Sequence, residues 1–170
     1  MSELDSPLQE LQRRVQETVS GMSPDLLERR LPGKWCAGEI FEHLYLTYTG
    51  TIKGLQRVSD AGAPRVTAPT LTARVRKLVV LGLHYMPTGR EAPAFARPRG
   101  LSTDVIIAEI VPRIAELDAA ITSVEHQLGK GKLLDHPFLG PLSGAEWREF
   151  HLVHGLHHLK QIDGLRLPQR

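Results

Sequence analysis

The sequence predicts an all-α fold, in which four longer helices pack as a bundle and shorter helices are added to it. Apolar residues recur at three- and four-residue spacing in the long stretches, which is typical of helices that bury one face. Capping residues, prolines and glycines bound these stretches. No stretch alternates clearly between apolar and polar residues, as half-buried strands do. A helical bundle is the expected way to bury such faces.

Three helices are predicted in the first part of the chain. Ser6 followed by Pro7 is an N-cap with proline at the first helical position, so a helix is expected from there to about Val19. The same signal predicts a short helix over residues 25–31. The third helix is predicted over residues 36–58, where apolar side chains at helical spacing form one face.

The middle of the chain is predicted to hold a shorter helix and a long connection. The helix is expected over residues 71–84 and ends before a methionine–proline pair. Residues 87–100 are rich in proline, glycine and arginine and have no apolar period. This composition indicates either an ordered loop over one end of the bundle or a mobile lid.

Two long helices complete the predicted bundle. The first is expected over residues 103–128, with a kink at Pro112 because proline lacks the backbone donor that the helix needs. The second begins at a capping box that starts at Ser143 and continues to about Gly164.

Composition and charge exclude several classes of protein. The chain has 170 residues, enough for one domain, and we predict a single domain over residues 1–170. A net charge of +2 does not demand nucleic acid or an anionic membrane as partner. The one cysteine, Cys36, excludes an intramolecular disulfide framework. Without a secretory signal or a long apolar run, a cytoplasmic protein that binds a small molecule is expected.

Histidines are concentrated near the end of the chain. Four of the eight lie in the last predicted helix: His151, His154, His157 and His158. His154 and His158 are about 40° apart on the helix surface and one turn apart in height, so both can reach one metal ion. His151 lies about 10 Å along the axis from His158, too far for both to form bonds of roughly 2 Å to one ion. A third ligand must come from another helix, and His43, on the apolar face of the helix over residues 36–58, is the best candidate.

The spacing alone leaves a second interpretation equally open. His154 and His158 can be metal-free histidines that pack in the core or at a dimer interface and bond to backbone carbonyls. Motif matches of this kind carry a real risk of false positives. The stoichiometry of a bound metal would separate the two interpretations.

Two segments of the chain carry a more specific pattern. Near the C-terminus, Asp-His-Pro-Phe-Leu-Gly-Pro-Leu-Ser at residues 135–143 and the pair Glu146-Trp147 lead into His-Gly-Leu-His-His-Leu-Lys-Gln at residues 154–161. Trp35 and the run Glu-Ile-Phe-Glu-His-Leu at residues 39–44 form the second segment. Together they resemble the DinB-like (DinB/YfiT) metal-binding superfamily of bacterial proteins, in particular a branch known only as a domain of unknown function. The middle of the chain matches it only as a generic helical pattern.

This resemblance implies a DinB-type four-helix bundle whose metal ligands are His43, His154 and His158, with His157 as a neighbour. It implies a divalent ion, with zinc as the first choice and nickel or iron as alternatives. Superfamily members include thiol-dependent S-transferases and a maleylpyruvate isomerase, so the implied function is activation of a low-molecular-weight thiol or water toward a small electrophile, of S-transferase or hydrolase type. The resemblance also implies a homodimer. The alternative is a non-catalytic metal-binding or structural bundle.

Four further residues are candidates for supporting roles around the ion. Glu39 lies one turn before His43 and is expected to accept from its free N–H. Gln161 follows His158 by three residues and is expected to do the same or to contact substrate. Simple exposure to solvent is the alternative for both Glu39 and Gln161. Trp147 and His151 project from the same side of the last helix and are candidates for lining the approach to the ion, with core packing as the alternative for Trp147.

Overall fold

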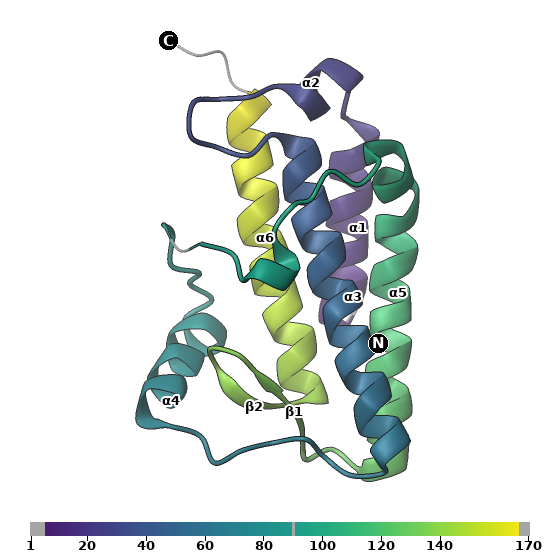
Figure 1. Cartoon of the computed structure of the whole chain (residues 1–170), viewed down its shortest axis with the longest axis vertical. Coiled ribbons are helices and arrows are strands. Elements are labelled where there is room, and N and C mark those ends of the chain that lie inside the picture. Colours follow the sequence, from purple (N-terminus) through teal and green to yellow (C-terminus); the bar gives the residue numbers. More distant parts are fainter. Residues whose placement is uncertain (1–5, 90, 167–170) are drawn as a thin grey trace, which may run out of the picture.

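A computed structural model describes residues 6–89 and 91–166 of the chain. Four long helices, α1, α3, α5 and α6, lie side by side, and a short helix and a small hairpin lie at one end of them (Figure 1). The elements in the described part are α1 (Pro7–Ser20), α2 (Pro24–Glu28), α3 (Ala37–Ala61), α4 (Leu71–Lys77), the π-helical turn η1 (Leu78–Gly82), the 3-10 turn η2 (Ala94–Ala96), α5 (Thr103–Leu128), β1 (Lys132–His136), β2 (Gly140–Ser143) and α6 (Gly144–Arg166).

The helices begin where the sequence signals place them. The Ser6 hydroxyl accepts from the backbone N–H of Gln9 at 3.3 Å, and the Gln9 side chain accepts from the backbone of Ser6 at 2.8 Å. The backbone N–H of Ser143 donates to Glu146 at 2.8 Å, and the Glu146 N–H donates back to the Ser143 hydroxyl at 3.3 Å. Both are capping boxes, which satisfy donors that a helix start leaves open. The prediction of these starts is confirmed.

The expectation of a fold without strands is wrong. β1 and β2 form an antiparallel hairpin in which Leu134 pairs with Leu142. Each strand is too short to show an alternating pattern, and Pro141 in β2 removes a backbone donor, so the segment reads as a turn from sequence alone. The hairpin forms because burial of its leucines against the helices compensates for weak local propensity: Leu133 and Leu142 are fully buried.

Two connections differ from their predictions. The helix predicted over residues 71–84 is α-helical only to Lys77 and then widens into η1, where the N–H of Leu83 bonds to the carbonyl of Leu78. The loop over residues 87–100 does not cover an end of the bundle. Its η2 turn lies against α3 near the middle of the molecule (Figure 1), and Ala96 within it is only 2% exposed. The helix α5 continues through Pro112.

Close contact between α1 and α6 depends on a glycine beside a predicted ligand. Gly155 has no side chain, and a Cβ at this position would overlap the Cδ1 atom of Leu11, which is fully buried. On its other side, α6 is held to α5 by Arg148, whose guanidinium donates to Asp118 at 2.6 Å and to Glu125 at 2.8 Å. These contacts fix the position of the helix that carries the histidines.

The single domain predicted over residues 1–170 stays a prediction, since residues 1–5, 90 and 167–170 lie outside the described part. In that part, no helix is both long enough and apolar enough to cross a bilayer.

Replacing Gly155 by alanine is expected to lower the free energy of unfolding by about 1–3 kcal/mol, because the added methyl group overpacks the contact with Leu11. Urea denaturation measures this loss. The matched control is Gly164→Ala in the same helix, where an added Cβ meets nothing within 4 Å. There the better helix propensity of alanine should stabilise by up to about 1 kcal/mol. Equal effects of the two substitutions would show that α1 and α6 are not in tight contact.

Candidate metal centre

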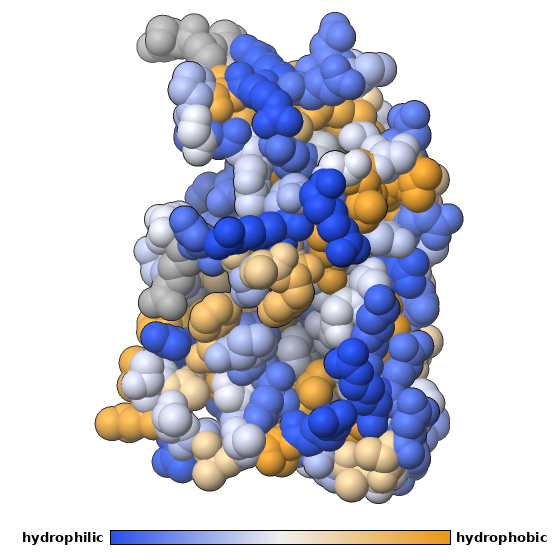
Figure 2. Space-filling model, viewed as in Figure 1, coloured by the Kyte–Doolittle hydropathy of each residue, from blue (hydrophilic) through white to orange (hydrophobic). Residues whose placement is uncertain are grey.

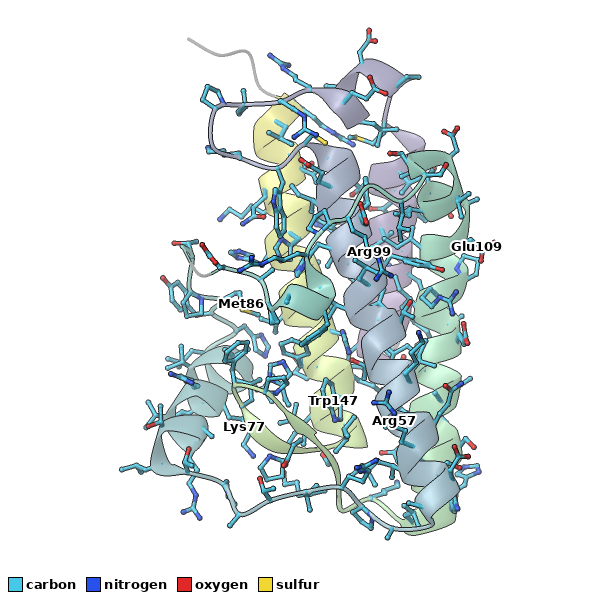
Figure 3. All side chains as sticks on the ribbon, in the orientation of Figure 1. Arg57, Lys77, Met86, Arg99, Glu109 and Trp147 are labelled. Atoms are coloured by element: carbon cyan, nitrogen blue, oxygen red, sulfur yellow. The ribbon has the colours of Figure 1, made fainter. Side chains whose placement is uncertain are left out.

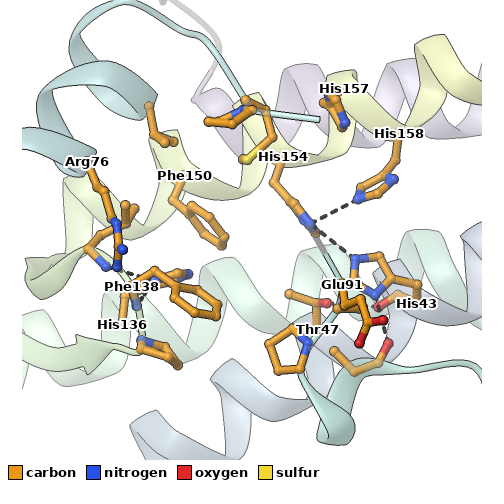
Figure 4. Close-up of a pocket in the computed structure, with 18 of the residues that line it drawn as sticks. His43, Thr47, Arg76, Glu91, His136, Phe138, Phe150, His154, His157 and His158 are labelled. Carbon is orange, nitrogen blue, oxygen red and sulfur yellow. Dashed lines mark hydrogen bonds between the residues drawn. The ribbon is translucent and has the colours of Figure 1, made fainter. Parts of the chain in front are cut away.

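Three histidines from two helices meet at one point. The Nε2 atom of His154 lies 3.2 Å from Nε2 of His43 and 3.1 Å from Nε2 of His158. One ring nitrogen from each of the three lies within 4.8 Å of the others. Figure 4 shows the rings of His154 and His158, from α6, directed at the ring of His43, from α3. The three residues that the sequence singled out are therefore brought together.

Aromatic neighbours hold two of these rings in place. The Trp35 ring lies 5.3 Å from the ring of His43, between centroids. The Phe150 ring stacks on the ring of His154 at 5.3 Å and an interplanar angle of 14°. Both contacts restrict rotation of the imidazoles, so little conformational freedom remains to be lost when a ligand binds.

Hydrogen-bond partners fix the protonation of two of the rings. Nδ1 of His43 lies 2.7 Å from the carbonyl oxygen of Ala96, which can only accept, so Nδ1 carries the proton. Nδ1 of His158 lies 2.8 Å from Oε1 of Gln161 and carries its proton for the same reason. In the neutral rings, both Nε2 atoms therefore present lone pairs toward Nε2 of His154.

A bound cation would satisfy the lone pairs of these Nε2 atoms more completely than hydrogen bonds can. Nε2 of His154 can donate one proton at most, so it can satisfy only one of the two lone pairs that face it. For tetrahedral zinc with bonds of about 2.05 Å to nitrogen, neighbouring ligand nitrogens are roughly 3.3 Å apart. Two of the three nitrogen–nitrogen separations, 3.2 and 3.1 Å, are close to this value, and all three are within 4.8 Å. The three histidines form a group that can hold a metal ion.

Burial keeps all three ligand candidates neutral. Desolvation lowers the pKa of His43, and that of His158 to about 3. The pKa of His154 lies well below its usual value, mainly because the ring is buried and also because His158 and His43 lie beside it. Neutral imidazole is the form that binds metal, so the site needs no deprotonation near neutral pH.

A buried carboxylate anchors the segment that holds His43. Glu42 is 3% exposed, and its two oxygens accept from the backbone N–H groups of Arg99 at 2.8 Å and Gly100 at 3.2 Å. Figure 3 shows Arg99 where this segment crosses α3. The carbonyl of Ala96, three residues before Arg99, is the partner of His43. This link could not be predicted from the sequence, because nothing local connects residue 42 with a loop more than fifty residues later.

The structure places Gln161 beside two histidines. Its oxygen lies 2.8 Å from Nδ1 of His158, and its nitrogen lies 3.0 Å from Nε2 of His157. The amide group thus bridges the two rings and orients that of His158. His157 does not belong to the group of three converging nitrogens.

The other three supporting residues are placed elsewhere. Glu39 does not reach His43: its carboxylate accepts from the backbone N–H of Cys36 at 2.9 Å and from Arg30 at 3.0 Å. The backbone N–H of Cys36 at the helix start and the guanidinium of Arg30 lie closer to Glu39 than the imidazole of His43, one turn later, does. The expected contact between Glu39 and His43 is therefore a wrong prediction.

Trp147 and His151 pack in the core and do not line the approach to the histidines. Trp147 is 4% exposed and donates to the carbonyl of Leu134 at 3.3 Å (Figure 3). His151 is fully buried, stacks on Trp147 and lies 3.1 Å from the hydroxyl of Thr51. Their face of α6 is covered by α3 and the hairpin, which explains why their shared direction with His154 does not lead to the site.

A cavity of about 410 Å³ opens beside the three histidines. Its walls are mainly apolar and come from α3, α4, η1, η2 and the segment before it, the hairpin turn and α6. Trp35 and His136 also line it, although the sequence pointed to them only as part of the family resemblance and gave neither a place in a cavity. His136 accepts from the backbone N–H of Phe138 at 3.1 Å through Nδ1, and burial lowers its pKa to about 4. The volume falls in the range of roughly 300–1,000 Å³ that is usual for small-molecule sites.

Comparison with known proteins identifies a family. The family described as "Protein of unknown function (DUF1569)" has a model that matches residues 8–164, which is nearly the whole chain. Neither the curated proteins nor the solved structures contain a significant match.

Replacing Glu42 by glutamine is expected to loosen the segment around η2, because an amide offers only one acceptor where a carboxylate offers two. The backbone N–H groups of Arg99 and Gly100 should exchange with solvent faster, by a factor that corresponds to about 1–3 kcal/mol. Hydrogen exchange followed by NMR measures this change. The control is Glu109→Gln, since Glu109 is exposed on α5 and points away from the helices (Figure 3). Unchanged exchange in Glu42→Gln would contradict the anchoring role.

The stability of the metal-free protein is expected to fall in acid, partly through His151. Its pKa is lowered to about 3 by burial, whereas an unfolded histidine titrates near 6.5. The unfolded state therefore binds more protons in this window, so stability is highest above it and declines as the pH falls toward 3. Between pH 7 and pH 5 this one group should account for about 2 kcal/mol. His151→Phe should reduce the loss measured by urea denaturation by that amount, and an unchanged loss would contradict the assignment.

Proposed function

We propose that this chain, which belongs to the DUF1569 family, binds one divalent metal ion through His43, His154 and His158 and uses it to activate a low-molecular-weight thiol or water toward a small electrophilic substrate. One observation carries the proposal: three neutral, pre-oriented imidazole nitrogens converge on the wall of a cavity of small-molecule size. The reaction type that we propose is that of an S-transferase or a hydrolase.

The donor set supports a catalytic role for the ion. Three protein ligands leave coordination positions open, as in catalytic zinc sites, whereas structural sites are closed by four. A metal ion bound by three neutral imidazoles lowers the pKa of a bound water or thiol toward neutral pH. All three histidines line the cavity, so a substrate bound there would lie beside an ion that they held. Imidazole ligands suit zinc first, with nickel or iron as alternatives.

The protein's own residues supply positioning and a dry environment. The Ala96 carbonyl and the Gln161 amide hold His43 and His158 with their Nε2 lone pairs directed at the centre. Apolar side chains along the cavity exclude water and strengthen electrostatic interactions within it. The chain's one cysteine, Cys36, is buried, and this burial raises the pKa of its thiol. A reacting thiol must therefore come from a cosubstrate, because Cys36 also lies outside the cavity wall.

The type of bundle, the compartment and the oligomeric state are also part of the proposal. We propose that the four long helices form a bundle of DinB type and that the protein acts in the cytoplasm, as a homodimer, without nucleic acid or membrane as partner. The support is the sequence resemblance, the side-by-side packing of α1, α3, α5 and α6, and the small net charge. The alternative function is a bundle that holds the metal without turnover.

Metal binding should depend on His158 and not on its neighbour. Protein purified without added metal, then loaded with zinc, is expected to hold one equivalent by elemental analysis. His158→Ala removes a ligand and should weaken zinc affinity by more than the roughly 10–100-fold that is typical for loss of an outer partner. His157→Ala, the matched control one position away, should retain the full equivalent. A protein that takes up no stoichiometric ion, or two variants that behave alike, would rule out this centre.

Turnover should follow the same pattern as metal binding. The zinc-loaded protein is expected to accelerate transfer of a small thiol to an aromatic halide electrophile, or hydrolysis of an activated ester. His158→Ala should abolish the acceleration and His157→Ala should keep it. Stoichiometric zinc with no acceleration over a panel of thiols and electrophiles would instead favour the non-catalytic alternative.

A further inference from the structure

Among the arginine and glutamate side chains that line the described wall of the cavity, only Arg76 has no ion-pair partner in the described part of the chain. Glu91 is paired with Arg97 at 2.6 Å. Arg76 also lines the cavity, and none of the ion pairs between described residues includes it. Its guanidinium carries a positive charge.

Arg76 occupies a definite place in the cavity wall. It lies on α4, and the residue that follows it, Lys77, forms an ion pair with Glu146 of α6 at 3.1 Å. The same short helix lies against the hairpin, since the Cβ of Ala73 would be 3.3 Å from a Cβ added to Gly140. α4 is therefore fixed to both α6 and the hairpin. Figure 4 shows Arg76 on one side of Phe138 and Phe150, with the three histidines on the other side.

The cavity wall between Arg76 and the three histidines is apolar and partly open to solvent. Phe95, Val75 and Phe138 line the cavity and are 59%, 55% and 41% exposed. Figure 2 shows further apolar side chains along the edge of the molecule formed by α4, where Leu71 and Leu78 are also exposed. Large apolar groups left exposed around a cavity are typical of a binding site, because burial against a ligand removes them from water.

We propose that the cavity takes a small carboxylic acid with an apolar body, in which Arg76 binds the carboxylate and the far end of the molecule reaches the three histidines. Guanidinium and carboxylate match in charge and in planar, two-pronged geometry. The apolar walls hold the body between them, and the distance between the charged end and the histidines selects for length. This inference rests on the proposed function for the chemistry at the histidines, whereas the anion contact depends on Arg76 alone.

Binding of phenylbutanoate and of its neutral amide, phenylbutanamide, tests the inference by calorimetry. The zinc-loaded protein is expected to bind the carboxylate more tightly than the amide. Arg76→Gln should weaken binding of the carboxylate by about tenfold, because a hydrogen bond to a charged group is lost, and should leave binding of the amide unchanged. Arg76→Lys keeps the charge and should retain the preference in part. Arg74→Gln removes an exposed arginine of the same helix that does not line the cavity and should change nothing.

Three results would overturn the inference. One is equal binding of the two probes by wild type and Arg76→Gln, another is no binding of either probe at millimolar concentration. The third is a preference for the carboxylate that is lost in His158→Ala and kept in Arg76→Gln, which would place the carboxylate on the metal ion. Elemental analysis of each sample separates the two proposals. Stoichiometric zinc with no effect of Arg76→Gln leaves the metal centre standing, whereas an Arg76-dependent preference in a protein without zinc supports the anion site alone.

Discussion

Three imidazoles packed together in neutral form are the constraint on which the rest of this molecule depends. The Nε2 atoms of His43 and His158 present lone pairs toward His154, which can satisfy only one of them by donation. Such a contact is unfavourable without a cation, so the fold must hold it from outside. Trp35 and Phe150 pack against the rings, the Ala96 carbonyl and Gln161 fix two tautomers, and Gly155 lets α1 approach the helix that carries two of the histidines. These supporting contacts determine whether the three ligand nitrogens converge.

The site therefore depends on parts of the chain that are distant in sequence. Glu42 is adjacent to His43 but acts through Arg99 and Gly100, whose segment returns the Ala96 carbonyl to the His43 ring. The short helix α4 contributes Arg76 only because Lys77 and the hairpin hold it against α6. A bundle of four helices supplies a rigid base, and irregular segments on its side supply the cavity. This division is common, since loops and short elements tolerate the varied shapes that binding needs.

Much of the fold could be predicted because its signals are local. Capping boxes at Ser6 and Ser143 and the helical period of apolar residues depend on neighbours within one or two turns, and both boxes are present in the structure. The hairpin of β1 and β2 could not be predicted, because its strands are stabilised by burial of Leu133 and Leu142 against distant helices. The widening of α4 into η1 and the course of residues 91–100 across α3 have the same cause. Their backbone groups find partners that the local sequence does not specify.

The candidate site, like the fold, has features that local sequence determines and features that depend on tertiary packing. The sequence by itself determined that His154 and His158 share one face of a helix, since a spacing of four residues has only one geometry there, and it also indicated His43. Only the tertiary structure decided that the three nitrogens meet, that Glu39 bonds to Cys36 and Arg30 rather than to His43, and that Trp147 and His151 are covered. The helical period gives a direction for each side chain. What lies in that direction depends on how other elements pack, and that is set by the burial of the whole core.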